Sequence, residues 1–145
     1  LETIQDSSYT PSVDVDDAVP TKVIHSDGSI SKVVIITKAE KFDKIKAALN
    51  EIGIGGMTVT KVSGCGVQKG QTSFYRGAKV NMELLPKLKV EVVVSEVPVS
   101  DVVTAAKKAL YTGNIGDGKI FVYDVADVIR ISTNARGKDA LKYEE

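Results

Sequence analysis

The stretch GCGVQKGQTSFYRGAKVNMELLPK, from Gly64 to Lys87, separates two segments whose apolar residues are spaced as in β-strands. It opens with closely spaced glycines and continues through polar and mixed residues without a steady period. A connection of this length is uncommon in a small domain and is usually functional or disordered. Glycines at its start allow the backbone to approach an anion closely. We therefore interpret the stretch as a loop that binds a ligand at its base and a partner protein through Tyr75, Arg76 and Gly77.

The residues before this loop predict a strand, a helix and a second strand. β-Branched residues from Val33 to Ile36 favour a buried strand. Thr37 and Glu40 have the spacing of a capping box, which predicts that a helix begins there. Gly53 stands where that helix should end, and residues 57–62 alternate as in a second strand that leads into the loop. The apolar stripe of the helix consists of Phe42, Ile45, Leu49 and Ile52.

The residues after the loop repeat the order strand, helix, strand. Apolar residues alternate at 88–94 and predict a strand with one buried face. A helix is expected over about 98–113, followed by a glycine-rich turn and the strand KIFVYDV at 119–125. A last extended piece is expected at 127–133. The residues of that piece predicted to share one face are Arg130 and Ser132.

The order β-α-β-loop-β-α-β predicts an α+β fold, a ferredoxin-like βαββαβ sandwich with a long loop between strands 2 and 3. A chain of 145 residues is long enough for one such domain with its own core. We place the domain at residues 30–136, after an acidic and flexible N-terminal tail at 1–29 and before a C-terminal tail at 137–145. A tail that orders on a partner or on a neighbouring subunit is the alternative. The acidic residues that mark the first tail include Asp14, Asp16, Asp17 and Asp27.

Composition excludes several classes of function. The formal net charge is zero and 26% of the residues are charged, which argues against a nucleic-acid or membrane-surface binder. No apolar run approaches the roughly 20 residues of a membrane span. Cys65 is the single cysteine, which rules out an internal disulfide and fits a reducing compartment. His25 is the single histidine, so one chain cannot form a two-histidine metal site.

Four segments resemble the PII nitrogen-regulatory signal-transduction proteins. They are GMTVTKVSGCGVQKG at 56–70, YRGA at 75–78, LPKLKVEVVV at 85–94 and TGNIGDGKIFVYDVADVIRI at 112–131. The resemblance covers roughly residues 30–136, which is almost the entire predicted domain. It implies a homotrimer of ferredoxin-like subunits with a nucleotide bound in each cleft between neighbours. It also implies that the long loop reports ATP, ADP and 2-oxoglutarate to target proteins.

A simple helix-to-strand turn is one interpretation of the glycines around residue 117. A phosphate site is the other, because glycines leave backbone N–H groups free to face phosphate oxygens. The resemblance favours the phosphate site and assigns adenine selection to two strand residues. It also assigns a guanidinium that reaches the neighbour's phosphates across the interface. The residues it implies for nucleotide binding are Thr58, Gly64, Gly66, Gln68, Lys69, Glu91, Gly116, Asp117, Gly118, Lys119, Arg130 and Ser132.

The resemblance implies a second ligand beside the phosphates. Gln68 would coordinate Mg²⁺ held by the ATP phosphates, which suits the preference of this ion for oxygen ligands. The residues implied for 2-oxoglutarate are Gln68, Lys69, Gly70 and Lys87. Two departures from the family pattern bear on ligand affinity. Ser132 stands where a second arginine is usual, and Val67 stands where an arginine commonly precedes the glutamine.

We therefore expect a cytoplasmic regulator of a nitrogen-assimilation enzyme or an ammonium transporter, which would meet the membrane only through the transporter. Such a protein is not an enzyme, although slow ATP hydrolysis would be compatible with its role. Two other classes stay open. One is an enzyme on the same fold, against which the predicted domain has no histidine and no evident nucleophile–base pair. The other is a divergent adenine-nucleotide sensor that lacks 2-oxoglutarate sensing and controls a different pathway.

Overall fold

The structure is a computed structural model, and it describes residues 30–65, 73–75, 78–80 and 83–142. The strands are β1 Ile30–Lys38, β2 Thr58–Cys65, β3 Ser73–Tyr75, β4 Ala78–Val80, β5 Leu84–Val94 and β6 Lys119–Val125. The helices are α1 Phe42–Glu51, α2 Val99–Leu110 and α3 Lys138–Leu141.

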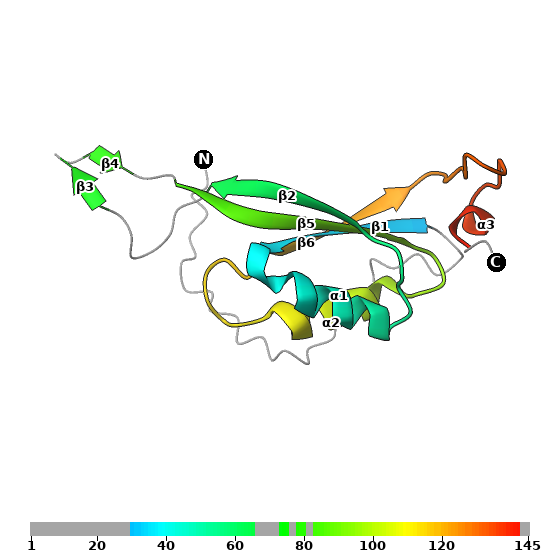
Figure 1. Cartoon of the computed structure of the whole chain (residues 1–145), viewed down its shortest axis with the longest axis horizontal. Coiled ribbons are helices and arrows are strands. Elements are labelled where there is room, and N and C mark those ends of the chain that lie inside the picture. Colours follow the sequence, from blue (N-terminus) through cyan, green and yellow to red (C-terminus); the bar gives the residue numbers. More distant parts are fainter. Residues whose placement is uncertain (1–29, 66–72, 76–77, 81–82, 143–145) are drawn as a thin grey trace, which may run out of the picture.

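A four-stranded antiparallel sheet in the order β2-β5-β1-β6 forms the centre of the molecule. Helices α1 and α2 lie side by side on one face of this sheet (Figure 1). The central pair β1 and β5 is not consecutive in the chain, because each strand is followed by a crossover that includes a helix. This arrangement confirms the predicted ferredoxin-like α+β fold. The long connection adds β3 and β4, which pair with each other as a separate two-stranded hairpin.

The core lies between the sheet and the two helices. The alternating residues of β5 predicted to face one way are all buried, as are Ile45 and Leu49 from the predicted stripe of α1. Val102 and Ala106 of α2 close the core from the other helix. Burial of each large aliphatic side chain stabilises the folded state by roughly 1.5–3 kcal/mol. The packing that buries the alternating residues of β5 and the apolar stripes of both helices is therefore strongly favoured. The buried residues of β5 are Leu88, Val90, Val92 and Val94.

The predicted capping box at Thr37 and Glu40 is wrong. A 3₁₀ turn spans Ala39–Lys41, α1 begins at Phe42, and no side chain caps either segment. The Thr37 hydroxyl is buried and instead donates a hydrogen bond of 2.9 Å to the backbone carbonyl of Asp117. A buried hydroxyl must find a partner, and here a residue 80 positions away in the chain supplies it.

The extended piece predicted at 127–133 is also wrong, because the chain turns back on itself. Residues 131–133 form a turn, and Ile129 forms an isolated bridge with Arg136 on the returning chain. Asn134 has a φ of 58°, a left-handed conformation that asparagine tolerates better than most residues. The shared strand face predicted for Arg130 and Ser132 is lost with the strand, but both residues line one hollow.

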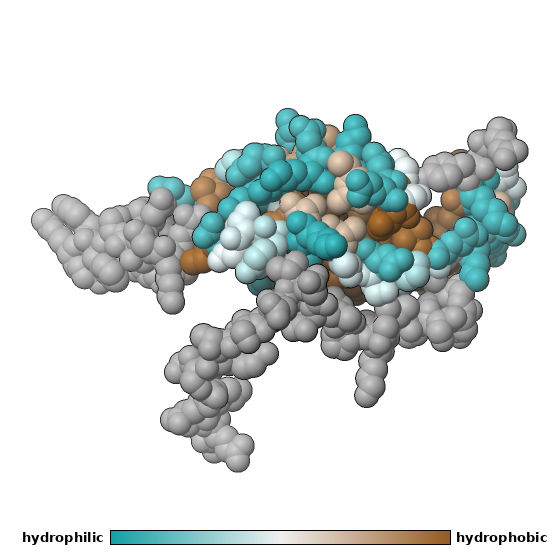
Figure 2. Space-filling view, turned by 90° about the horizontal axis from the view of Figure 1, so that it is seen from below, coloured by the Kyte–Doolittle hydropathy of each residue, from teal (hydrophilic) through white to brown (hydrophobic). Residues whose placement is uncertain are grey.

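The two faces of the sheet differ in character. Figure 2 views the helix side and shows hydrophilic residues over most of it, with a small hydrophobic cluster toward the end where α3 lies. Neither α1 nor α2 covers the opposite face of the sheet (Figure 1), and Val93, Phe121 and Tyr123 on that face are each between 39% and 53% exposed. Within the part of the chain that the structure describes, no helix is long and apolar enough to cross a membrane.

Candidate functional site

The turn between α2 and β6 is pressed against β1 at a glycine. Gly118 has a φ of 112°, and a Cβ atom there would lie 1.9 Å from the backbone carbonyl oxygen of Ile36. No real Cβ contact is that short, so only glycine fits. Gly116 also has a positive φ, 100°, and the side chains of two lysines pass close to it. The turn therefore exposes backbone instead of side chains at this end of the sheet.

Asp117 holds the turn in shape. Its carboxylate accepts hydrogen bonds from the backbone N–H of Thr112 at 2.7 Å and of Gly113 at 3.0 Å, and also from the Thr112 hydroxyl. Partial burial alone would raise the pKa of Asp117, but these hydrogen bonds and the nearby Lys38 outweigh it and keep the pKa below its usual value. The Asp117 carboxylate thus points into its own loop and stabilises the turn that contains Gly116 and Gly118.

Lysines gather around this turn. Lys38 and Lys87 stand directly opposite each other on β1 and β5, and Nζ of Lys87 lies 3.4 Å from the carbonyl oxygen of Gly116. Lys119 is the first residue of β6 and stands opposite Ile36 of β1, so it lies on the same face of the sheet as Lys38 and Lys87. Like charges directly opposite each other in a sheet are destabilising, and a bound anion would relieve that repulsion. We call Lys38, Lys87 and Lys119 the lysine cluster.

Sequence reasoning missed Lys38. In the sequence it is an ordinary lysine after a strand, and only the pairing of β1 with β5 brings it opposite Lys87. Gly64 completes this end of the site, because a Cβ there would lie 3.0 Å from Cγ of Lys87. The glycine thus leaves room for the Lys87 side chain to lie across β2. The predicted approach of an anion to the backbone at Gly64 stays a prediction.

The other predicted residues line an open hollow of about 740 Å³ at the opposite end of the sheet. Thr58 of β2 stands directly opposite Glu91 of β5, and Arg130 and Ser132 reach the same hollow from the C-terminal turn. Met57 and Val93 form an apolar part of the wall of this hollow. The structure therefore brings together the two strand residues predicted to select a base and the arginine predicted to reach phosphates.

Two lysines hold the carboxylate of Glu91. Nζ of Lys32 lies 2.7 Å from its Oε1, and Nζ of Lys89 lies 3.8 Å from the same oxygen. The hydrogen bond from Lys32 is the largest influence, and it keeps the pKa of Glu91 below its usual value of 4.5. Glu91 is therefore ionised throughout the physiological pH range, and it can only accept hydrogen bonds.

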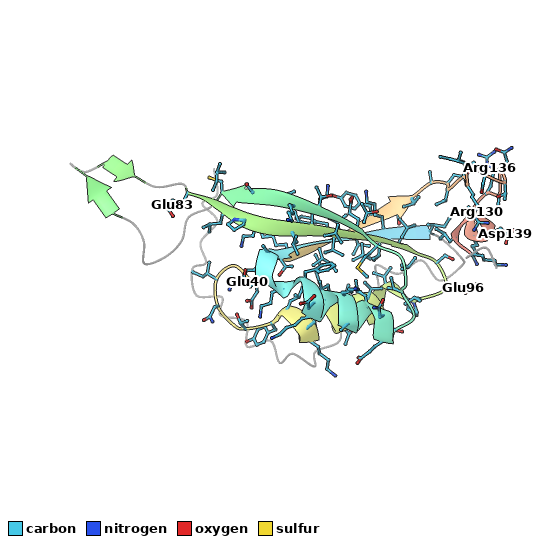
Figure 3. The ribbon with its side chains drawn as sticks, viewed as in Figure 1. Glu40, Glu83, Glu96, Arg130, Arg136 and Asp139 are labelled. Atoms are coloured by element: carbon cyan, nitrogen blue, oxygen red, sulfur yellow. The ribbon has the colours of Figure 1, made fainter. Side chains whose placement is uncertain are left out.

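Arg130 ties the C-terminal helix to this hollow. Its guanidinium donates hydrogen bonds to the backbone carbonyl of Ala140, at 3.2 Å, and to that of Lys142. Figure 3 shows Arg130 beside α3, with Arg136 at the outer side of the same region. Arg136 is paired with Asp127, whose Oδ2 lies 2.9 Å from the Arg136 Nε. The residues that we predicted to form a C-terminal tail thus include α3, which forms part of the wall of the hollow.

The two groups of residues lie too far apart to share one small ligand within a chain. Thr58 and Gly64 are six residues apart on β2, which corresponds to about 20 Å along the strand. Among the residues that the structure describes, no cluster of three histidine, cysteine or carboxylate side chains is arranged to hold a metal. Tyr75 ends β3. The predicted site residues that lie outside the described ranges are Gly66, Gln68, Lys69, Gly70, Arg76 and Gly77.

Comparison with known proteins identifies the family. Residues 30–135 match the family described as nitrogen regulatory protein P-II. The chain belongs to the PII family. It is 46% identical over 114 residues to the nitrogen regulatory PII-like protein of Bacillus subtilis, with 79% of this chain and 98% of that protein covered. It is 47% identical over 112 residues to the nitrogen regulatory protein P-II of Rhodospirillum rubrum, with 77% of this chain and all of that protein covered.

Solved PII structures have the same fold. The chain is similar to the ATP complex of Bacillus subtilis GlnK with a TM-score of 0.67 and 41% identity, covering 78% of this chain and 96% of that one. It is similar to Arabidopsis thaliana PII bound to citrate with a TM-score of 0.62 and 36% identity, covering 79% and 94% of the two chains. The expectation of a PII-type regulatory protein is thereby confirmed, while the roles of its individual residues stay predictions.

Proposed function

We propose that this protein binds ATP or ADP between neighbouring subunits of a homotrimer and signals the bound state to a partner. The observation that supports the proposal is that the predicted nucleotide-binding residues fall into two groups at opposite ends of one sheet. The glycine turn and the lysine cluster suit phosphates, and the hollow around Thr58 and Glu91 suits a base. A second copy that places its hollow against the glycine turn would complete the site, in the manner of a cyclic head-to-tail assembly.

The uncovered face of the sheet favours association with neighbouring copies. Val93, Phe121 and Tyr123 are partly exposed there, and contact with neighbouring copies would bury them. In such a trimer Arg130 would approach the neighbour's phosphates, where a planar guanidinium binds two oxygens at once. To do so it must release the carbonyl groups of α3. Ser132 beside it offers a hydroxyl but no charge, which predicts weaker phosphate binding than a pair of arginines would give.

We further propose that 2-oxoglutarate binds beside the phosphates. Lys87 and Lys38 present two ammonium groups at the base of the long loop, which suits a small dicarboxylate. Gln68, Lys69 and Gly70 would complete this part of the site, and Mg²⁺ would be held by Gln68 together with ATP phosphates. The similar Arabidopsis thaliana PII was solved with citrate, another small polycarboxylate, which supports the proposal by analogy.

The proposed partner surface is the loop tip around Tyr75, Arg76 and Gly77. An arginine next to an aromatic residue in the sequence is a good candidate for a binding hot spot. The partner would be a cytoplasmic nitrogen-metabolism enzyme or an ammonium transporter. Replacing Arg76 with glutamate should disrupt capture of that partner while ATP binding is unchanged. Equal capture by the variant would contradict a role for the loop tip.

Calorimetry and light scattering test the central proposal. ATP and 2-oxoglutarate should bind with positive and reciprocal coupling that requires Mg²⁺, and the particle mass should be three times the 15.5 kDa of one chain. Lys87→Ala should abolish 2-oxoglutarate binding and retain most ATP binding. Lys61→Ala, on the other side of the sheet, serves as the matched control. A monomeric mass would overturn the site between subunits.

The alternative is a divergent adenine-nucleotide sensor that no longer binds 2-oxoglutarate. Its motivation is the altered pattern at Val67 and Ser132, where the family resemblance implies arginines. The same titration separates the two proposals. ATP binding without any 2-oxoglutarate heat in the presence of Mg²⁺ would favour the divergent sensor.

A further inference from the structure

The outer surfaces of α1 and α2 form an open groove of about 700 Å³. The two helices lie side by side (Figure 1), and the residues that line the groove recur three and four positions apart on each helix. Ala48 and Ala105 are half-buried within it. Their small side chains leave room between the helices on the side that faces away from the sheet. We call this surface the helix groove.

The charges of the helix groove are sorted by sign. β1 and β5 are antiparallel, and each is followed by a helix that returns along it, so α1 and α2 also run in opposite directions. Lys44, near the start of α1, therefore shares one end of the groove with Lys108, near the end of α2. Glu51 and Asp101 share the other end. We call these the basic end and the acidic end.

The stability of α1 does not explain this order of charges. The N-terminus of a helix favours carboxylates and the C-terminus favours ammonium groups, yet Lys44 is in the first turn of α1 and Glu51 is its last residue. In the part of the chain that the structure describes, none of the four charged side chains of the groove takes part in an ion pair. A partner with charges in the opposite order would satisfy both ends at once.

Residues 1–29 carry charges in that opposite order. They contain six carboxylates and one basic side chain, Lys22, so their formal charge is −5 and that of residues 30–145 is +5. Asp16 and Asp17 precede Lys22, and the residues between, AVPT at 18–21, have small side chains that suit an alanine floor. The family match begins at residue 30, so the family fold does not account for this segment.

The length of the chain permits the contact. β1 begins beside the end of β5, from which the chain enters α2, so Ile30 lies at the acidic end of the groove. Lys22 is eight residues before Ile30 and can reach about 26–29 Å from it, whereas a helix is about 10–12 Å thick. Asp17 can reach a further 16–18 Å or so, which exceeds the roughly 10 Å between Lys44 and Glu51 along α1.

We propose that residues 14–22 of this chain dock in the helix groove, with Lys22 at the acidic end and Asp16 and Asp17 at the basic end. Exposed ion pairs are individually weak, but covalent attachment gives the segment a high effective concentration. The docked segment would exclude other proteins from the outer surface of the helices. The proposed trimer would bury the opposite face of the sheet, so the inference goes beyond the proposed function and does not depend on nucleotide binding.

Trypsin tests the contact, because Lys22 is the only lysine or arginine in residues 1–29. The initial rate of cleavage after Lys22 is measured by mass spectrometry on the full chain without nucleotide. Asp16→Asn/Asp17→Asn and, separately, Lys44→Gln/Lys108→Gln should each speed this cleavage about threefold to tenfold, because each removes the ion pairs at the basic end. Salt at about 0.5 M should have the same effect on the parent.

Two control variants remove the same charges elsewhere. Glu2→Gln/Asp6→Asn acts outside the docking segment, and Lys46→Gln/Lys61→Gln acts outside the groove, so neither should change the rate. Combining the two test variants should change the rate less than about twofold beyond the faster of them, because both remove one contact. Unchanged rates in both test variants, or effects that multiply in the combined variant, would overturn the inference.

Disulfide trapping locates the docked segment. In a Cys65→Ser background, Val19→Cys with Ala105→Cys should form a disulfide within one chain, because a disulfide requires Cα atoms within about 7 Å. Val19→Cys with Asn50→Cys, which is exposed on α1 outside the groove, should react at least about tenfold more slowly. Equal rates, or a product with the mass of two chains, would overturn docking within one chain and leave the proposed function standing.

Discussion

Replacing Gly118 with alanine should disrupt the turn that we assign to phosphate binding. The new Cβ would lie 1.9 Å from the carbonyl oxygen of Ile36, 2.9 Å from the carbonyl carbon of the same residue and 3.1 Å from Cα of Thr37. The separation from the oxygen must grow by more than 1 Å. Ile36 is paired with Lys89 on one side and with Lys119 on the other, so its carbonyl cannot move without disturbing the sheet.

The magnitude follows from three contributions. A non-glycine residue at a φ of 112° costs about 1–2 kcal/mol. Forcing backbone apart in a packed region costs about 1–3 kcal/mol, and the hydrogen bond from Thr37 to the Asp117 carbonyl would be lost at about 1 kcal/mol. We therefore expect Gly118→Ala to lower the free energy of unfolding by about 3–6 kcal/mol and to weaken ATP binding at least tenfold.

Gly53 provides a matched control. Its φ is 90°, but a Cβ added there would meet no atom within 4 Å. Gly53→Ala should therefore cost only the backbone strain, about 1–2 kcal/mol, and should leave ATP binding unchanged. Urea unfolding at one fixed protein concentration measures both variants, because subunit association would make stability concentration-dependent. If Gly118→Ala is no more destabilising than Gly53→Ala, the turn is not pressed against β1 and the reasoning about the site is refuted.

Three further predictions concern the same elements. Thr37→Val should lower the free energy of unfolding by about 1 kcal/mol in urea, because the carbonyl of Asp117 loses a buried donor; an unchanged midpoint would contradict this hydrogen bond. The folded-state pKa of Asp117 is lowered, so its stabilising effect is present above its ordinary pKa of 3.8 and is lost as the pH falls through the lowered value. Asp117→Asn should accordingly be less stable than the parent at neutral pH, and a difference that fails to shrink as the pH falls well below 3.8 would show that the carboxylate charge is not involved. Truncation after Gly137 removes the carbonyls that Arg130 binds, so ATP should bind about threefold to tenfold more tightly by calorimetry; weaker binding would mean that α3 is needed as a wall of the site.

Much of the fold could be predicted because the spacing of apolar residues along the chain shows which face of each strand or helix is buried. Alternation along residues 88–94 required a strand with one buried face, and the stripe of α1 required a helix on that face. The element order then left few topologies. The resemblance of two glycine-containing segments, far apart in the chain, to the PII family could also be recognised from the sequence. The family comparisons confirmed it. The two local predictions that failed, the capping box and the extended piece after Asp127, were those that a tertiary contact or a chain reversal overrode.

By itself, therefore, the sequence determined the family, the order of strands and helices, and the glycines that one turn requires. Only the tertiary structure decided that Lys38 stands opposite Lys87, that Lys32 holds Glu91 and that Thr37 binds the turn at Asp117. It also decided that the predicted site residues fall into two groups about 20 Å apart. The physical reason is that side-chain periodicity specifies a face within one strand, whereas the register between strands depends on how the whole core closes.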